Sequence, residues 1–366
     1  MKLISLALLT FLLNLPIFGQ TIEPILLGVS NAQSGPAEKL GNRLNLGAEL
    51  YFTQLNANGG IHQRPVQLVS LDDGYEPFRA VQNTYHFLNR TDVFALFNYV
   101  GTPTSFAVLP LVEKHDSLYL MPFTGAEFLR YPAKDYIVNL RASYYQEADA
   151  QIAYLFDNLQ IEKLGLLIQS DEFGKAVEQG YLKALNSRKL TPTVTTRFRR
   201  NTEDISLALD ILMKHDVDAV AFVGTYKPLA ELINLGFKRS FQPVYATVSF
   251  VSSHDLFLRI ESPSHVVVTQ VMPEPATCSL SVCKQFIAAA KASGVQGIDP
   301  VVFEGYLNAY VFSEVAKQCD ELSRACFKVQ YRQFQANLGG LNVAYDKHTH
   351  QGMKDIYFSI YDTFEK

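Results

Sequence analysis

A hydroxyl-rich turn after one of the apolar segments has the composition of an anion-binding site. The segment Asp92–Phe97 reads as a strand and leads into the run NYVGTPTS at 98–105. Thr102 is placed to cap a helix that has a proline in its first turn. The amino end of such a helix offers unpaired N–H groups, and the hydroxyls of Thr102, Thr104 and Ser105 add donors. The turn predicts a site for a carboxylate or similar anion. The alternative is an ordinary capped helix without a ligand.

Motifs that carry catalytic chemistry are missing from the sequence. The segments after the first strand of each half, NAQSGPAEKLG and QSDEFGKAVEQG, lack the GxGxxG glycines, and there is no P-loop, GxSxG elbow or HExxH motif. The histidines, including His348 and His350, are expected to be exposed rather than metal ligands. We therefore expect a protein that is not an enzyme and that uses no cofactor and no metal.

The four cysteines form two locally spaced pairs, Cys278 with Cys283 and Cys319 with Cys326. An uninterrupted helix would hold the members of each pair too far apart to bridge, so a disulfide requires a helix end between them. We expect both local disulfides, because the chain is expected to be exported. Four free or buried thiols are the alternative.

Length and charge limit the classes of partner. The chain has 366 residues, 48% hydrophobic and 19% charged, with a formal charge of −4 and no basic run. This length is typical of two domains, and the composition is that of a folded protein. The charge pattern argues against nucleic acid and against a basic membrane-binding patch.

The first twenty residues have the layout of a secretory signal. One lysine at position 2 precedes an apolar run from Leu3 to Leu15, and Pro16 and Gly19 follow. We expect cleavage near Gln20 and a soluble periplasmic protein. An uncleaved anchor is the alternative, although the apolar run is shorter than the roughly 20 residues that a membrane span needs.

Short β-type segments alternate with helix-period segments along most of the chain. Strands are predicted at Ile25–Ser30, Val66–Leu71, Asp92–Phe97, Leu118–Met121, Lys163–Ile168, Thr193–Phe198, Asp218–Val223, Pro243–Thr247 and His265–Thr269. Helices are predicted at Lys39–Asn56, Pro77–Leu88, Phe173–Asn186, Glu203–Lys214, Pro228–Leu235 and Val301–Lys317. Such alternation predicts βαβ units and an α/β fold with parallel sheets. Because the strand spacing of 25, 66 and 92 repeats at 163, 193 and 218, we expect two α/β lobes of like topology.

Several segments, in order, resemble the type I periplasmic binding proteins of the leucine/isoleucine/valine-binding family. They are GVSNAQSGP (28–36), LNLGAELYFTQLNANGGI (44–61), PVQLVSLDDG (65–74), MPFTG (121–125), DEFGKAVEQGYLKAL (171–185), GTYKP (224–228) and GLNVAYDKHTHQG (340–352). The resemblance implies two Rossmann-like lobes joined by a three-strand hinge, with a ligand held between them. Lobe one would combine 22–139 with 275–338, and lobe two 141–270 with 345–366. The crossings would fall near 140, at 270–275 and at 340–344.

The resemblance also implies which residues hold the ligand. In lobe one these are the Thr102, Thr104 and Ser105 turn, the turn of Phe123, Thr124 and Gly125, and Ser34 after the first strand. In lobe two they follow strand ends, and Tyr226 within GTYKP matches the family pattern best; the others are Tyr145, Asp171 and Ser249. A solvent-exposed loop residue is the alternative for each of these three.

The sequence departs from the family pattern at one position. Amino-acid-binding members place a carboxylate from lobe two on the ligand's ammonium, but the matching stretch at 245–250, YATVSF, has none. Asp171 or Glu147 could substitute; otherwise the ligand has no ammonium. Glu304 is interpreted as part of the polar side of its helix, and Leu40 with Phe123 indicates an apolar wall.

The expected function is capture of a small, carboxylate-bearing organic ligand, an amino acid or a related acid or amide, for an inner-membrane ABC permease. Signalling to a sensor kinase is the alternative. We expect a monomer that binds no nucleic acid and does not insert stably in the membrane.

Overall fold

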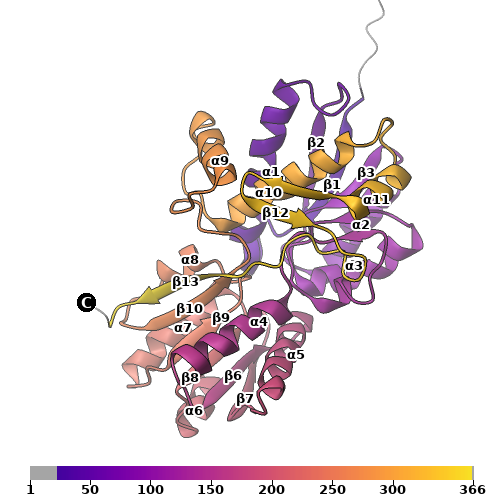
Figure 1. Ribbon diagram of the computed structural model, residues 1–366. Coiled ribbons are helices and arrows are strands. Elements are labelled where there is room, and N and C mark those ends of the chain that lie inside the picture. The colour runs from indigo at the N-terminus through magenta and orange to yellow at the C-terminus, as the bar shows by residue number, and fades with distance from the viewer. Residues whose placement is uncertain (1–22, 365–366) are drawn as a thin grey trace, which may run out of the picture.

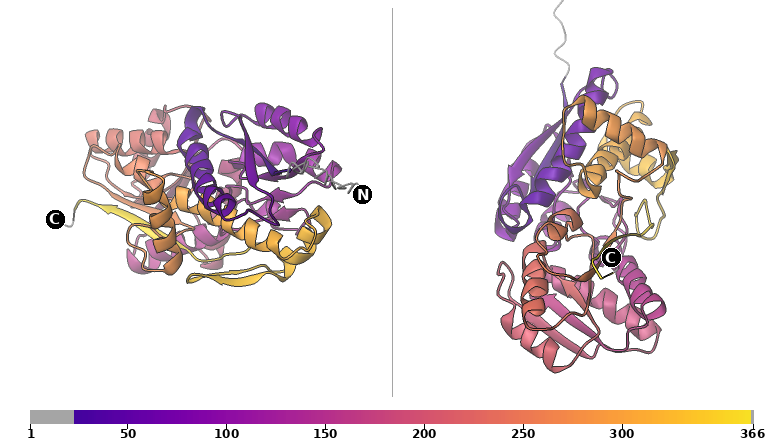
Figure 2. Two further views of the ribbon diagram at one scale, coloured as in Figure 1. Left: turned by 90° about the horizontal axis from the view of Figure 1, so that it is seen from above. Right: turned by 90° about the vertical axis from the view of Figure 1, so that its left-hand side faces the viewer.

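The computed structural model describes residues 23–364 as two α/β lobes (Figures 1 and 2). The predicted signal segment lies outside these residues. Among the described residues, none of the helices has the length and apolar character needed to cross a bilayer.

The first sheet has the strand order β2-β1-β3-β4-β5, and all of its pairings are parallel. Its strands are β1 (Ile25–Asn31), β2 (Val66–Asp72), β3 (Val93–Phe97), β4 (Tyr119–Leu120) and β5 (Ile137–Val138). The helices of this lobe are α1 (Glu38–Ala57), α2 (Pro77–Leu88), α3 (Thr102–Lys114), α9 (Ser281–Ala292), α10 (Pro300–Lys317) and α11 (Arg324–Gln333). Figure 1 shows the late helices α9 to α11 beside the early elements, as the interleaved arrangement requires.

The second sheet repeats this topology. Its order is β13-β10-β9-β8-β6-β7, with only β13 antiparallel to its neighbour. The strands are β6 (Leu164–Gln169), β7 (Val194–Phe198), β8 (Ala219–Val223), β9 (Val244–Thr247), β10 (His265–Gln270) and β13 (Tyr357–Asp362). The helices are α4 (Tyr144–Ala153), α5 (Glu172–Ser187), α6 (Ser206–Lys214), α7 (Tyr226–Lys238) and α8 (Ser253–Phe257). The predicted α/β class with two lobes and parallel sheets is thus confirmed.

In each sheet the chain first adds a strand on one side of its starting strand and then continues on the other side. The reversal lies between β1 and β3 in one sheet and between β6 and β8 in the other. Ligands of open α/β sheets bind in the crevice beyond the carboxyl ends of the strands at this reversal. The two sheets therefore define one crevice each.

The strand predictions were correct to within two residues at each end, but elements near the hinge were missed. Besides β5 and β13, these include the hairpin of β11 (Gln335–Leu338) and β12 (Leu341–Ala344). Gly352 and Met353 donate backbone hydrogen bonds to Asn139 and Leu140. These pairings favour a third crossing near 351–353 rather than at 340–344, and the lobe boundaries themselves stay a prediction.

Helices α1 and α10 of lobe one pack closely against each other beside the crevice. A Cβ at Gly47 would lie 1.8 Å from the carbonyl oxygen of Val302, and a Cβ at Gly305 would lie 2.1 Å from that of Leu44. Only glycine allows the two backbones to approach so closely. This contact sets the position of the amino-terminal half of α10, which carries Glu304.

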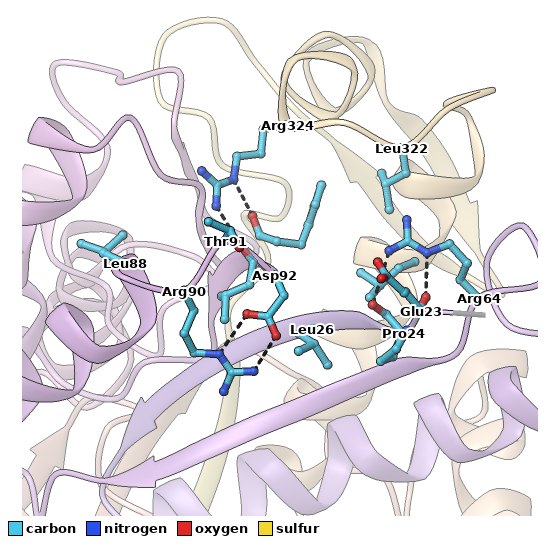
Figure 3. Close-up of a pocket in the computed structure, with 13 residues that line it drawn as sticks. Glu23, Pro24, Leu26, Arg64, Leu88, Arg90, Thr91, Asp92, Leu322 and Arg324 are labelled. Atoms are coloured by element: carbon cyan, nitrogen blue, oxygen red, sulfur yellow. Dashed lines mark hydrogen bonds and ion pairs between the residues drawn. The ribbon is translucent and has the colours of Figure 1, made fainter. Parts of the chain in front are cut away.

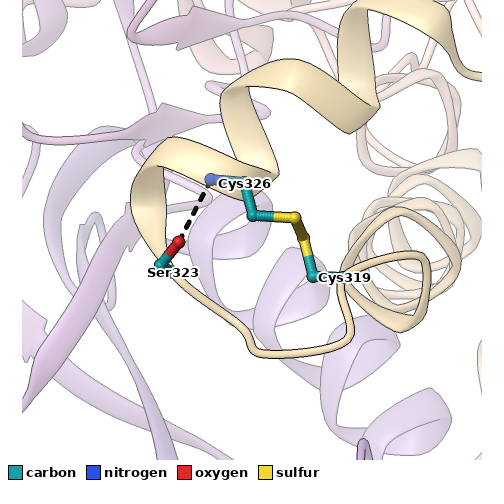
Figure 4. The surroundings of a disulfide bond; sticks show 3 residues. All are labelled: Cys319, Ser323 and Cys326. Atoms are coloured by element: carbon teal, nitrogen blue, oxygen red, sulfur yellow. Dashed lines mark hydrogen bonds between the residues drawn. A yellow bond between two sulfur atoms is a disulfide. The ribbon is translucent and has the colours of Figure 1, made fainter.

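Two disulfides join neighbouring elements of lobe one. Cys278 bonds to Cys283 across the start of α9, and Cys319 bonds to Cys326 between the end of α10 and the start of α11 (Figure 4). The hydroxyl of Ser323 accepts a hydrogen bond from the Cys326 N–H and caps α11. A helix end lies within each pair, as the spacing requires.

Candidate functional site

The carboxyl ends of the two sheets face one another, and aromatic side chains from both lobes fill the space between them. Phe250, after β9, lies with its ring centroid 4.7 Å from that of Phe173, 5.6 Å from Tyr75 and 5.9 Å from Phe123. The Phe173 ring also lies 5.5 Å from that of Tyr144. All five rings are buried.

This aromatic cluster combines predicted and unpredicted residues. Phe123 was predicted as a ligand contact, and Leu40 belongs to the same buried apolar group. Tyr75 and Tyr144 were missed, although each closely follows a strand or a chain crossing, the position that identified the other candidates. Their hydroxyls are buried and have no hydrogen-bond partner among the described residues.

The hydroxyl-rich turn is placed in the crevice, but its cap was wrongly assigned. Gly101, not Thr102, is the N-cap of α3, with φ at +106°. A Cβ there would also meet the Tyr75 ring at 2.3 Å, so the turn requires glycine. Thr102 therefore begins the helix, and its hydroxyl lies 2.7 Å from that of Thr124.

The other two hydroxyls of the turn differ in what they can offer. Thr104 Oγ1 donates back to the Val100 carbonyl at 2.5 Å, as threonine hydroxyls inside helices often do, so its proton is not free for a ligand. In this structure Thr104 is therefore not a free donor, and its role toward a ligand stays a prediction. Ser105 Oγ accepts from Tyr119 Oη at 2.8 Å and keeps its own proton available. Gly125 packs against Tyr144, whose backbone nitrogen a Cβ would approach to 2.5 Å.

Four buried charges lie where the chain passes from one lobe to the other. They are Arg130 and Arg141 from the segment around the first crossing, Glu147 from α4 and Glu304 from α10. The guanidinium carbon of Arg141 lies 4.2 Å from the Phe123 ring centroid of lobe one, and its Nη2 donates to Ser249 Oγ after β9. Glu304 was interpreted as solvent-facing, which is wrong: its side chain is 4% exposed because the α1–α10 contact turns it inward.

Glu147 is fully engaged in lobe two. Its carboxylate accepts from the Ser249 backbone N–H at 2.7 Å, from Ser249 Oγ at 2.9 Å and from Thr269 Oγ1 at 2.8 Å. Burial raises its pKa, while Arg141 and these donors oppose the increase. Asp171 is similarly engaged: it caps α5 through the Gly174 N–H and lies 3.2 Å from Arg200. Both residues proposed from the sequence as ammonium partners thus already have structural partners.

Two arginines connect the lobes through ion pairs. Arg43 on α1 donates to both carboxylate oxygens of Asp255 on α8, at 2.7 and 2.9 Å, and also pairs with Asp299 at 2.8 Å. Arg200 after β7 donates to the Glu76 carboxylate at 3.2 Å and to the Tyr75 carbonyl. Sequence reasoning singled out neither arginine.

The remaining predicted contacts lie at the rim. Ser34 donates to Asp72 within lobe one at 2.6 Å. Tyr145 is half-buried beside a groove of about 330 Å³ that also borders Phe106 and Phe128. Tyr226 is the first residue of α7, with its ring 5.8 Å from the guanidinium carbon of Arg259. These three do not touch the aromatic cluster, whereas Ser249 lies next to it.

One narrow void lies at the hinge side of the cluster. It measures about 170 Å³, is too narrow for a water-sized sphere, and takes its lining from both lobes: Phe123, Arg141, Ser249, Gln270, Val271, Met272, Pro300, Val301 and Glu304. The crevice is therefore closed around a slot that carries a cation and an anion.

A much larger hollow, of about 730 Å³, lies at the opposite, amino end of the first sheet (Figure 3). Its arginines are already engaged: Arg324 donates to the Val93 and Phe94 carbonyls, Arg64 to those of Glu23 and Pro24, and Arg90 to Asp92. We therefore place the candidate site at the crevice and not in this open hollow.

The described residues contain no group of three or more His, Cys, Asp or Glu side chains arranged to hold a metal ion. His350, expected at the surface, is 5% exposed, because it packs on Tyr331 and its Nδ1 lies 3.0 Å from the Lys134 carbonyl.

Comparison with known proteins agrees with this arrangement. A family model described as periplasmic binding protein matches residues 24–363. A crystal structure described as a possible leucine/isoleucine/valine-binding protein from Rhodopirellula baltica is 27% identical, covers 93% of this chain and 96% of that one, and superposes with a TM-score of 0.87. A branched-chain amino acid ABC transporter protein from Thermus thermophilus with bound valine shares the fold at 15% identity and a TM-score of 0.81, covering 92% of each chain.

Among curated sequences, the Leu/Ile/Val-binding protein of Escherichia coli is 22% identical over 213 residues, or 58% of this chain. The match spans 57% of the length of that relative.

Proposed function

The chain belongs to the periplasmic binding protein family, and from this premise we propose that it captures a small organic solute between its lobes by hinge closure. Members of this family are substrate-binding proteins rather than enzymes. The observation that carries the proposal is the narrow slot, because its lining comes from both lobes and includes a buried charge from each side of the crevice.

Closure follows from the contacts between the lobes. The packing of Phe250 on Tyr75 and Phe123, and the ion pairs of Arg43 with Asp255 and of Arg200 with Glu76, are made only while the lobes are together. A ligand that adds contacts to both lobes shifts the population toward this closed state. No covalent chemistry is required.

A carboxylate is the group of the ligand that the site accommodates best. The amino end of α3 offers N–H groups and the Ser105 hydroxyl, and Arg141 lies on the hinge side of Phe123. Thr102, Thr124 and Ser249 complete the polar lining in this proposal. Tyr226, Tyr145, Asp171 and Ser34 would act at the rim of the crevice.

The partner we propose is an inner-membrane ABC permease, which would recognise the closed protein in the periplasm as a monomer. Relatives named for branched-chain amino acids and for an ABC transporter support this assignment. Delivery of the same closed surface to a sensor kinase is the second candidate. Adjacent genes for permease and ATPase subunits would favour the first, and a sensor kinase gene the second.

Native mass spectrometry of freshly purified protein, followed by thermal shift against amino acids, carboxylates and amides, tests ligand capture. We expect a bound small molecule, or a ligand that raises the melting temperature. The double variant Thr102→Ala, Ser105→Ala should weaken a carboxylate ligand. A protein that neither retains nor is stabilised by any compound of the panel would contradict the proposal.

A further inference from the structure

A second hollow crosses the junction between the lobes, outside the aromatic cluster. It measures about 330 Å³, which is within the range of small-molecule pockets. Lobe one contributes Phe106 from α3 and two residues of a 3-10 turn, Glu127 and Phe128. Lobe two contributes Tyr145 from α4 and the first two turns of α5. We call this hollow the α3–α5 groove, since these two helices pack side by side there (Figure 1). It shares no lining residue with the narrow void.

Aromatic rings form the apolar part of the α3–α5 groove. Phe106 is 53% exposed, and its ring centroid lies 5.5 Å from that of Phe128 in an edge-to-face arrangement. The half-buried Tyr145 and Ala176 of α5 line the groove from lobe two. Exposed rings that gather in a hollow are typical of a surface that a ligand covers. The rings therefore favour a ligand with an apolar body.

The charged side chains of the groove lack one positive charge. Asp171 caps α5 and pairs with Arg200 at 3.2 Å, so its charge is already balanced. Glu127, Glu172 and Lys175 also line the groove, and they take part in none of the ion pairs formed by residues 23–364. Two carboxylates against one ammonium leave a net charge of −1. A ligand with a single positive charge makes the groove neutral.

The rings and the carboxylates lie close enough together to act on the same cation. Burial and the nearby Glu127 carboxylate raise the pKa of Tyr145. The face of an aromatic ring attracts a positive charge, and Lys183 Nζ already lies 5.1 Å from the centroid of the Tyr145 ring. Within the described part of the chain, no lysine or arginine lies over Phe106 or Phe128 in this way. These two rings are therefore left for a ligand.

We propose that the α3–α5 groove binds a small organic cation with an apolar body, such as an aromatic amine, and that this ligand holds the lobes together from outside the crevice. Because both lobes line the groove, it is complete only in the closed form. A cation that binds there shifts the population toward closure and, by linkage, raises the affinity of the crevice for its own ligand. The cation site goes beyond the proposed function, whereas its coupling to the crevice rests on that function.

The sequence contains no tryptophan, which provides a direct binding assay. Indole fluorescence comes from the probe alone, so the fluorescence anisotropy of tryptamine reports its binding to the full-length mature protein. Tryptophol is the control probe, since it has the same ring and chain with a neutral hydroxyl in place of the ammonium. We expect tryptamine to bind at least about 5-fold more tightly than tryptophol.

Variants of the lining locate the site. Phe106→Ala and Glu127→Gln should each weaken tryptamine binding about 5-fold or more. Lys175→Gln removes the opposing positive charge and should strengthen binding about 3-fold. The matched control for the ring is Tyr85→Ala, because Tyr85 is 47% exposed on α2 and lies outside the groove. The control for the carboxylate is Glu314→Gln on α10. Both controls should bind as the wild type does, and circular dichroism establishes that every variant folds.

Distance measurements between spin labels on the two lobes test the coupling. Tryptamine should increase the closed population of the wild type without any crevice ligand, and should do so less in Phe106→Ala at the same concentration.

The outcomes separate the parts of the proposal. Absence of saturable tryptamine binding, or unchanged binding by Phe106→Ala and Glu127→Gln, overturns the site. Equal affinity for tryptamine and tryptophol, or weaker binding by Lys175→Gln, overturns the preference for a cation. Binding that leaves the distances between the lobes unchanged overturns the coupling. Failure of solute capture in the thermal shift panel leaves the cation site standing, so the two proposals can fail separately.

Discussion

Replacing Asp255 by asparagine should open the crevice without disturbing either lobe. Asp255 contacts Arg43 through two short hydrogen bonds that cross from α8 to α1, and the two side chains are 11% and 22% exposed. Arg43 keeps its ion pair with Asp299 in lobe one, so the substitution leaves no buried charge without a partner.

The expected magnitude follows from this geometry. Hydrogen bonds to charged groups contribute about 1.5–3 kcal/mol each, and asparagine can still accept one of the two. Partial exposure to solvent reduces the remainder, so we expect a loss of about 2 kcal/mol from the closed state. This corresponds to roughly a 30-fold shift of the equilibrium toward the open form.

Electron-electron distance measurements between spin labels on the two lobes would report the equilibrium directly. Phe78 and Leu207 suit cysteine substitution for labelling, because they are 71% and 74% exposed on different lobes. We expect Asp255→Asn to increase the open population, and added salt to increase it in the wild type by screening the pair. The control is Asp210→Asn, which removes an exposed ion pair with Arg239 inside lobe two. Identical distance distributions for the two variants would refute the role of Arg43 as a connection between the lobes.

Three further changes should alter stability in separate ways, each followed by thermal or urea unfolding. Gly101→Ala should lower the free energy of unfolding by about 2–4 kcal/mol, because this position has a positive φ and a Cβ would lie 2.3 Å from an aromatic ring. Gly294 has φ at +69° with open space around it, so Gly294→Ala should lower it by only about 1 kcal/mol. Equal losses would contradict the steric argument. Replacing Cys319 and Cys326 together by serine should lower the free energy of unfolding by about 2–3 kcal/mol for a loop of this length. An unchanged melting temperature would show that this disulfide does not constrain the unfolded chain. Burial raises the pKa of Glu304 from 4.5 to about 7, so between these pH values the folded state holds a proton that the unfolded state releases. The free energy of unfolding of the ligand-free protein should therefore fall by up to about 3 kcal/mol as pH rises from 4.5 to 7. Glu304→Gln should flatten this slope.

The regular elements were predictable because their signals are local. Each strand of the two parallel sheets is a short apolar run between turn residues. The strand spacing at 25–92 repeats at 163–218, and this repeat predicts that the two lobes share a topology. β5, with two residues, and β13, which pairs antiparallel at a sheet edge, carry too little periodicity to be recognised. Their places depend on chain crossings that no local pattern encodes.

The candidate site was only half predictable, for a related physical reason. Thr102, Phe123 and Ser249 follow strand ends, so the rule for open α/β sheets places them in the crevice. Gly101 was missed as the cap because its conformation is set by the Tyr75 ring from another loop. Such contacts between distant segments cannot be read from spacing.

Glu304 shows how far a helical pattern can mislead. In an isolated amphipathic helix, a glutamate is expected on the polar, solvent-facing side, and this was the interpretation of Glu304 from the sequence of α10. Gly305 is instead a point of contact with α1, so the face that includes Glu304 is pressed into the protein and toward Arg141. A glycine that allows two helices to touch also determines which neighbouring side chain becomes buried. If this reasoning is correct, Gly305→Ala should separate α1 from α10, raise the exposure of Glu304 and lower its pKa toward the value of a solvated carboxyl. Carbon-13 NMR titration of the glutamate side chains would measure that shift, and an unchanged titration in a folded Gly305→Ala protein would show that the helix contact does not control the buried charge.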